Sequence, residues 1–470
     1  MQTRRQFLQR SGAGFGGVAL ATMLAEQSAD GSGRYSLQPR EGHFSTKVKS
    51  VIWLFMHGAP SQVDTWDYKP QLARRHGQTL AGFDQSTGFF AGLGGPIMKS
   101  PFQFSRHGET GAWVSEIFPN LSKHVDEMAF VHSCYAFENN HSPAQFQISS
   151  GVSRMGFPCL GSWVVYGLGS ENQNLPGFIV MYDSLGRGTP KSRASSWGAG
   201  FLPAIYQGTA MNSGGSPIGN LRPHPRLNSG RQRAQLDLIK DLNTEYLNEN
   251  PHESALRSRI ESFELAFRMQ KSATDACSLN GETKQSKRLY GLDDRRCQHF
   301  GRQCLLARRL VERGVRFIQI YSGGFNNDDC WDGHNNIDRN HRTFAGETDL
   351  PIAGLIADLK QRGMLDSTLI VWCGEFGRLP LVQKGGTGRD HNPKAFTAWL
   401  AGGGVRAGVK YGATDELGNK AVENRVSVND LHATILHKMG LNHEQLTYRH
   451  NGRDHRLTDV AGRVIREVTG

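Results

Sequence analysis

Residues 51–56 form an unbroken apolar run, VIWLFM, and this run constrains the fold more than any other feature of the sequence. A strand with one face in water alternates apolar and polar residues, whereas a strand covered on both faces is apolar throughout. Comparable runs recur at residues 128–131 and 178–181, and we expect further strands at 315–320, 368–373 and 396–400.

Helical patterns lie between these runs. Apolar residues at helical spacing predict two long helices in 230–275, joined around Pro251. A further helix is expected at 351–362, because Pro351 suits a first turn and Gly363 suits a C-terminal stop. We also expect helices near 115–125, in the basic segment that ends at Gly314, and at 430–439. This alternation favours an α/β fold of three layers, in which a mainly parallel sheet carries helices on both faces.

The chain is basic, with 54 lysines and arginines against 43 aspartates and glutamates and a formal net charge of +11. An excess of this sign favours anionic partners, such as a small-molecule or glycan ester of phosphate or sulfate. The basic residues are scattered rather than gathered into long runs, so nucleic acid is not an expected partner. The seven cysteines include no CxxC pair and do not predict a disulfide framework, although one or two bridges would be compatible with their number.

The first 30 residues are typical of a signal for the twin-arginine translocation (Tat) pathway. Arg4 and Arg5 precede an uncharged stretch at 11–25, which is shorter than the about 20 residues that span a bilayer. A Tat signal is an address rather than an anchor. We therefore expect the Tat export machinery to read residues 1–30, a periplasmic or extracellular protein, and no integral membrane segment after signal removal. One domain with a helical insertion near 230–275 would then occupy residues 45–470.

Side chains that bind metals follow the predicted strands where those strands end. In a parallel sheet, ligands bind beyond the carboxyl ends of the strands. Histidine and carboxylate side chains hold Zn²⁺, Mn²⁺ and similar ions, and loops from one edge of a sheet can converge on one point. The candidate metal ligands at this edge are His57, Asp64, Asp332, His334, Glu375 and His391.

Other side chains in the same loops suit an anionic substrate. Arg378 and Arg389 could hold an oxyanion through two parallel hydrogen bonds, or could pair with the neighbouring carboxylates. His141 and Ser142 follow the strand expected at 128–131. The sequence holds no GxSxG elbow, no Walker A loop and no GxGxxG after a strand, which excludes serine hydrolases of that kind, P-loop enzymes and Rossmann dehydrogenases.

Six motifs together match one family over nearly the whole mature chain. They are HGAPSQVDTWDYKP from His57, LARRLVERGVRF from Leu306, WDGHNN from Trp331, GEFGR from Gly374, GRDH from Gly388 and DLHATIL from Asp430. The chain resembles the Tat-exported bacterial proteins named domain of unknown function 1501 (DUF1501), which are placed in the alkaline phosphatase and sulfatase superfamily. The resemblance implies an alkaline-phosphatase-like core and a metal centre with one or two divalent ions, Zn, Mn or Ca.

The resemblance also implies roles for single ligands. Asp332 and His334 fall where the superfamily has an Asp and a His on one loop, and His391 falls where its last His ligand is found. His57 stands where an Asp normally ends the first strand. Glu375 falls where an Asp-His pair follows a strand, with a phenylalanine in place of that His, so that one ion is as compatible with the sequence as two.

The segment from His141 to Pro143 occupies the place of the Cys-x-Pro-x-Arg signature of sulfatases. A sulfatase that uses formylglycine is therefore not expected. Ser142 or His141 would serve catalysis, with metal ligation as a further alternative for His141. The first hypothesis for function is an exported metal-dependent hydrolase of a phosphate or sulfate ester, with Arg378 or Arg389 on the substrate anion. The second hypothesis is a non-catalytic exported protein that binds an anionic polysaccharide or a surface partner on a degenerate sulfatase-like scaffold.

Overall fold

The computed structural model describes residues 37–214, 217–219, 228–249 and 254–470, and nine of its strands form one sheet. The predicted signal at residues 1–30 and the predicted junction at Pro251 lie outside these residues. In order across the sheet, the strands are β14 (Lys410–Tyr411), β5 (Met128–Tyr135), β13 (Phe396–Gly402), β9 (Thr368–Cys373), β1 (Ser50–Met56), β8 (Phe317–Ser322), β6 (Phe178–Met181) and β7 (Thr209–Ala210), and β17 (Val426–Ser427) pairs with β5.

The strand β1 lies at the centre of this sheet, parallel to both of its neighbours. It pairs with β8 on one side and with β9 on the other, and all of its residues are buried. The strand β13 is antiparallel to β5 and to β9, and the other pairings in the sheet are parallel. The prediction of a mainly parallel sheet is therefore confirmed.

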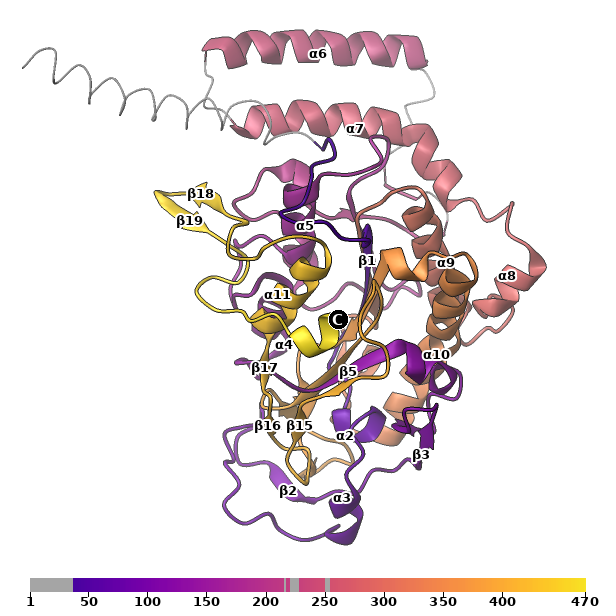
Figure 1. The fold of residues 1–470 in the computed structure, drawn as a ribbon, viewed down its shortest axis with the longest axis vertical. Helices are drawn as coiled ribbons and strands as arrows, with labels where there is room; N and C mark the ends of the chain where they lie inside the picture. Colours follow the sequence, from indigo (N-terminus) through magenta and orange to yellow (C-terminus); the bar gives the residue numbers. More distant parts are fainter. Residues whose placement is uncertain (1–36, 215–216, 220–227, 250–253) are drawn as a thin grey trace, which may run out of the picture.

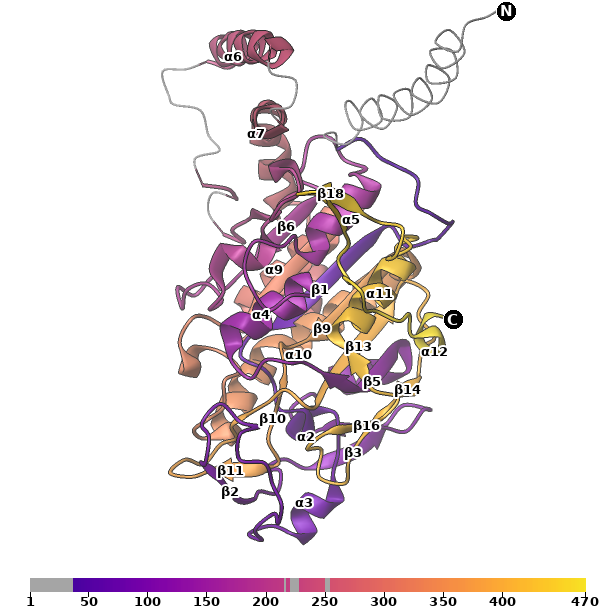
Figure 2. The ribbon, with the colours of Figure 1, turned by 90° about the vertical axis from the view of Figure 1, so that its left-hand side faces the viewer.

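Helices cover both faces of the sheet (Figure 1). On one face lie α4 (His141–Ser150), α5 (Leu160–Leu168) and α11 (Val428–Lys438), and on the other lie α9 (Gln298–Glu312) and α10 (Ile337–Gln361). The two predicted long helices are present as α6 (Ser229–Glu249) and α7 (Ser254–Cys277). Both views place α6 and α7 at the end of the molecule opposite β2 and α3 (Figures 1 and 2).

Short elements surround this core. The helices are α2 (Gln62–Thr65), α3 (Pro70–Arg74), α8 (Lys284–Leu289) and α12 (Arg466–Thr469), with 3₁₀ turns η1 (Leu121–Glu127), η2 (Arg193–Trp197), η3 (Ala204–Tyr206), η4 (Asn327–Asp329) and η5 (Leu365–Ser367). Five two-stranded sheets pair β2 (Gly94–Ile97) with β11 (Leu381–Gln383), β3 (Phe104–His107) with β4 (Ala112–Ser115), β10 (Gly377–Arg378) with β12 (His391–Asn392), β15 (Ala413–Thr414) with β16 (Ala421–Glu423), and β18 (Tyr448–His450) with β19 (Arg453–His455).

The prediction that a helix begins at Pro351 is wrong, because α10 begins at Ile337 and carries Pro351 in its interior. The first half of α10 lacks a recognisable apolar periodicity, because its buried face includes polar side chains. Glu347 binds Arg187, and Asp349 accepts hydrogen bonds from the backbone N–H groups at the start of η1. A proline inside a helix costs about 3 kcal/mol, and here it is tolerated within 25 helical residues.

Two other boundaries also differ from the prediction. The strand expected at 315–320 is Phe317–Ser322, because the ladder with β1 pairs Val51 with Phe317. The helix expected near 115–125 is the 3₁₀ turn η1.

All seven cysteines are buried and free, so the described residues hold no disulfide. Within the described ranges no helix combines the length and the apolar composition that crossing a membrane requires.

Candidate metal centre

Loops from five strands of the central sheet meet at one edge. The strands β1, β5, β6, β8 and β9 are aligned in one direction, so their carboxyl ends lie at the same edge. The antiparallel strand β13 begins at that edge, and β12 leads directly into it. The chain therefore delivers His391, which lies ahead of β13, to the residues that follow the parallel strands.

Four of the side chains predicted from the sequence form a cluster at this edge. Each of His141, Asp332, His334 and His391 offers one ligand atom, and these atoms all lie within 4.8 Å of one another. The Asp332 carboxylate is central. Its Oδ2 lies 3.0 Å from His141 Nε2, and its Oδ1 lies 2.9 Å from His334 Nε2 and 3.3 Å from His391 Nε2. We call these four residues the His–Asp cluster.

Each histidine of the cluster is held through its other ring nitrogen. The Nδ1 atoms lie 2.6 Å from Glu375 Oε1 for His141, 2.6 Å from Gln383 Oε1 for His334, and 2.6 Å from the carbonyl oxygen of Asn139 for His391. These three oxygens can only accept hydrogen bonds, so each Nδ1 carries the proton and donates it. In a neutral ring the Nε2 atom then carries a lone pair.

These lone pairs point at one another in the absence of a cation. His334 Nε2 and His391 Nε2 are only 2.9 Å apart, and neither has a proton to share with the other. Burial holds the pKa of His391 well below its usual value, so this ring is neutral. The buried His141 Nε2 is close to Asp332 without a hydrogen bond of acceptable geometry. A cation between these atoms removes the conflict, so the donor set fits a divalent metal.

Glu375 lies behind His141 rather than in the cluster. Its Oε1 accepts from His141 Nδ1 and from the backbone N–H of Gly58 at 3.1 Å. Burial alone would raise the pKa of Glu375, but the hydrogen bond from His141 lowers this pKa to about 2. Glu375 thus has the position of an orienting carboxylate, of the kind that fixes the ring of a metal-bound histidine, and it is not one of the four residues of the His–Asp cluster.

His57 also lies outside the cluster. Gln145 donates to its Nδ1 at 2.6 Å, while the Gln145 oxygen accepts from the backbone N–H of Ser192. Since Nδ1 accepts, the proton of the neutral His57 ring is on Nε2, and neither nitrogen offers a free lone pair. The next residue, Gly58, has a φ of +97°, and a Cβ there would lie 2.7 Å from the backbone nitrogen of Asp332. The loop after β1 therefore positions the cluster without ligating a metal.

The structure pairs Asp64 with Arg389 instead of bringing either to the cluster. Arg389 Nε lies 2.7 Å from Asp64 Oδ2, and its other nitrogens donate to Asp64 Oδ1 and to the carbonyl oxygens of Leu379 and Met98. Burial would raise the pKa of Asp64, but the charge of Arg389 and its hydrogen bond lower it below its usual value. Of the two alternatives that the sequence left open for Arg389, the structure therefore shows the pairing with a neighbouring carboxylate.

Arg378 is similarly occupied by the protein. Its guanidinium binds Asp332 Oδ1 at 2.7 Å and also donates to backbone carbonyls, including that of Ala59. Burial would raise the pKa of Asp332, whereas the charge of Arg378 holds it well below its usual range. Both arginines have an exposed fraction of 0%, whereas the four cluster residues retain 3–6%. The arginine side chains are therefore completely enclosed, whereas the cluster residues keep a small exposed fraction.

Ser142 and Lys191 complete the surroundings of the cluster. Ser142 is the second residue of α4, directly after His141, and is partly exposed. Lys191 was not predicted from the sequence. Its ammonium lies 3.0 Å from Asp332 Oδ2, and its side chain is 17% exposed. It lies beyond the carboxyl end of β6, where ligands of a parallel sheet bind, so its position after the strand at 178–181 is a sequence signal for it.

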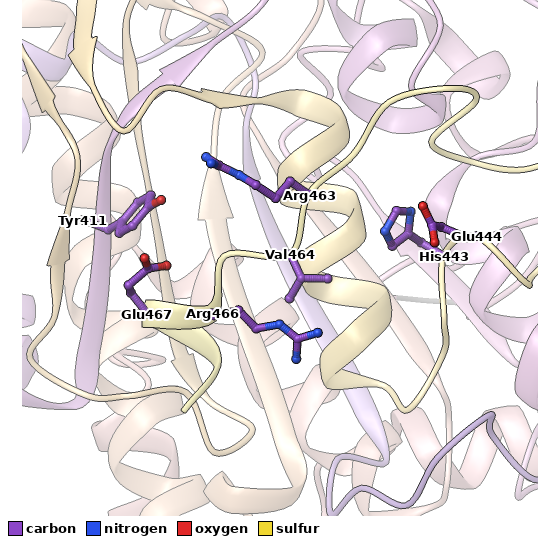
Figure 3. Close-up of a pocket in the computed structure, with 7 residues that line it drawn as sticks. All are labelled: Tyr411, His443, Glu444, Arg463, Val464, Arg466 and Glu467. Atoms are coloured by element: carbon purple, nitrogen blue, oxygen red, sulfur yellow. The ribbon is translucent and has the colours of Figure 1, made fainter.

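A separate surface pocket of about 400 Å³ lies elsewhere, between β14 and the segments around α11 and α12 (Figure 3). Glu467 lies beside Tyr411 on one side of it, and His443 and Glu444 lie on the other side (Figure 3). The ligand-type side chains therefore do not converge there. None of the residues predicted as ligands or catalytic groups lines this pocket.

Fold and site together define an α/β protein with a buried three-histidine, one-aspartate centre at the carboxyl edge of its sheet. The family model described as "Protein of unknown function (DUF1501)" matches residues 48–469, and the chain belongs to this family. A search of the curated proteins found no match.

Several solved structures are similar to the chain at low identity. The PsFucS1 sulfatase from Pseudoalteromonas sp. is 13% identical, with 84% of this chain and 68% of that chain covered and a TM-score of 0.36. The phosphonate monoester hydrolase SpPMH from Silicibacter pomeroyi is 12% identical, with 75% and 72% covered and a TM-score of 0.36. A mutant of TAB5 alkaline phosphatase with Mg bound is 11% identical, with 86% and 100% covered and a TM-score of 0.34.

Proposed function

We propose that the chain is an exported, metal-dependent hydrolase of a phosphate or sulfate ester. The single observation that carries the proposal is the convergence of three histidine Nε2 lone pairs on the Asp332 carboxylate. Each histidine is already fixed through Nδ1, which is how proteins prepare imidazole to bind a metal. His141, Asp332, His334 and His391 would hold the ion.

One ion fits this donor set better than two. Of the two residues that a second site would need, His57 has Nδ1 committed to Gln145, and Glu375 has Oε1 committed to His141 and only its buried Oε2 without a partner. Imidazole-rich sites favour Zn²⁺ and related ions, whereas Ca²⁺ prefers oxygen ligands only. A divalent ion held there would supply Lewis acidity toward the oxygens of the ester.

The residues of the chain suit the rest of the reaction. Lys191 is the partly exposed cation beside Asp332, and it would hold an oxygen of the anionic group. The guanidinium groups of Arg378 and Arg389 cannot do so, because they are fully buried. His141 is occupied on both nitrogens by Glu375 and the ion, so the nucleophilic role falls to Ser142 or to water. Replacing Ser142 by Ala distinguishes these two, because turnover survives the substitution only if water attacks.

Metal analysis of the mature protein by mass spectrometry, followed by a screen of phosphate and sulfate esters, tests the proposal. We expect one tightly held ion per chain, lost in His391→Ala and in Asp332→Asn together with turnover. Arg389→Lys is a matched control in a buried side chain that does not touch the cluster. A folded protein that holds no ion, or one whose turnover survives without metal, would refute the proposal.

Turnover also decides against the second hypothesis. If the protein binds an ion and an anionic polysaccharide but cleaves no ester, it is a binding protein on a hydrolase-like scaffold.

Export belongs to the proposal as well. Replacing Arg4 and Arg5 by lysines should retain the protein in the cytoplasm, because Tat recognition depends on the arginine pair.

A further inference from the structure

Two phenylalanines with exposed rings stand against the His–Asp cluster. Phe89 is 43% exposed and Phe90 is 39% exposed. The ring centroid of Phe89 lies 5.5 Å from that of His391, and the centroid of Phe90 lies 5.4 Å from that of His334. The two phenyl rings also touch each other edge to face, with centroids 5.0 Å apart. The outer side of two proposed metal ligands is thus bounded by an apolar surface that water reaches.

The loop that carries this pair is fixed to the cluster by the same residues that orient His391. The backbone N–H of Phe90 donates to Asp390 Oδ2 at 2.9 Å, and Asp390 Oδ1 accepts from the N–H of His391 at 2.7 Å. Asn139 donates to the carbonyl of Gly88 at 2.9 Å while its own carbonyl receives the His391 Nδ1 proton. Gly88 packs so closely on the Asp390 carboxylate that a Cβ there would collide with it.

A fixed, exposed phenylalanine pair has an energetic consequence. Burying a phenylalanine removes roughly 150–250 Å² of surface from water, and stacking adds about 0.5–1.5 kcal/mol per aromatic contact. Here the fold leaves two such rings partly in water although the neighbouring Phe376, 4.7 Å from His391 between centroids, is fully packed. That exposed area is available to a ligand that reaches the cluster.

The partly exposed cation and the phenyl pair both lie close to Asp332. Lys191 contacts Oδ2, whereas His334 and His391, which the two phenyl rings contact, lie beside Oδ1 together with the buried Arg378. An anionic group between the ion and Lys191 would therefore lie near a surface of aromatic rings that its organic substituent can contact. That surface suits the flat face of a ring and offers little to a short acyclic chain.

We propose that Phe89 and Phe90 form a platform for a ring attached to the ester group, so that the substrate is an aryl or pyranosyl ester rather than a short acyclic one. The inference rests on the proposed function for the position of the anionic group. It adds the substrate class and two residues that determine specificity. Both aryl rings and the C–H faces of pyranoses stack on aromatic side chains, so the chemistry is shared and the probes must separate the two sources.

Equilibrium binding tests the platform independently of turnover. Isothermal titration of the metal-loaded mature protein would compare methylphosphonate, phenylphosphonate and the phosphonate analogue of glucose 1-phosphate, in which a methylene group replaces the bridging oxygen so that no probe is hydrolysed. We expect phenylphosphonate, the glucose phosphonate or both to bind at least tenfold more tightly than methylphosphonate. The ring-bearing probe that binds more tightly identifies the source. In the double variant Phe89→Ala/Phe90→Ala the preference should fall below threefold while the affinity for methylphosphonate changes little.

Phe137→Ala is the control. Its ring is 69% exposed and contacts Tyr135, and it tests whether loss of any exposed phenyl ring from these loops has the same effect. Metal content and thermal melting of each variant show that it is folded and loaded. If the double variant keeps the wild-type preference, or if methylphosphonate and the ring-bearing probes bind wild type equally, the platform is refuted while the proposed function stands. If no probe binds the loaded protein, both are refuted.

Discussion

Replacing Asp64 by Asn separates the two roles that this residue could have. In the structure Asp64 neutralises Arg389 in a fully buried pair and lies outside the His–Asp cluster. Removing one partner of a buried ion pair leaves the other charge without a counterion and costs about 3–5 kcal/mol. For a domain of about 430 residues the entropy of unfolding is roughly 0.9 kcal/mol/K, so the loss corresponds to a Tm lower by about 3–6 °C.

The assay is thermal melting combined with metal analysis of the same preparations. Asp64→Asn should melt several degrees lower than wild type and still hold a full complement of the ion, whereas His334→Ala should lose the ion. A double variant, Asp64→Asn/Arg389→Gln, should be less destabilised than the sum of its two single variants, because the unpaired charge is removed with its partner. An Asp64→Asn protein that melts like wild type but lacks metal would show that Asp64 is a ligand and that the structural reasoning fails.

Three further substitutions test single contacts. Lys191→Met should weaken methylphosphonate binding about tenfold or more without loss of metal, measured by titration, because an ammonium-to-anion contact is worth about 1.5–3 kcal/mol. Glu375→Gln should lower metal affinity about 10–100-fold in a competition with a chelator, because it disturbs the partner of a ligand histidine. Burial lowers the pKa of His432 to about 4 while its Nε2 contacts the carbonyl of Ile148. The unfolded chain therefore takes up this proton first as pH falls from about 6.5 to 4, and folding loses about 3 kcal/mol across that window. His432→Gln should flatten this part of the curve of unfolding free energy against pH, and an unchanged slope would contradict the assignment.

The sequence predicts the six longest strands of the central sheet well because nearly all of their residues are buried. The run at 368–373 is apolar after Thr368 and becomes β9 with the same limits. The helix around Pro351 is different, because its buried face uses Glu347 and Asp349, whose partners lie far away in sequence. No local pattern carries that information, so the beginning of α10 could not be read from periodicity.

The candidate site is predictable to the level of the loop but not to the level of the atom. Strand ends identify all four residues of the His–Asp cluster, with His141 expected to act either in catalysis or as a metal ligand. They cannot distinguish a ligand from the residue that orients it. Glu375 and His57 have ligand chemistry, yet Oε1 of Glu375 and Nδ1 of His57 are committed to His141 and Gln145. Such roles follow from which nitrogen of a ring carries the proton, and that depends on contacts between distant segments.

The charges at the centre explain more about the ligand than the net charge of the chain does. Three carboxylates, Asp332, Glu375 and Asp390, face two cations, Arg378 and Lys191, and the three cluster histidines add no charge when they are neutral. The centre therefore carries one excess negative charge before an ion binds, and a divalent ion leaves it with one excess positive charge in buried surroundings. Uncompensated charge is costly there, so the loaded centre favours an anion. A phosphate ester and a sulfate ester can each supply the compensating negative charge. The scattered basic residues of the surface are not needed for this selectivity, which comes from a local balance that the addition of the ion disturbs.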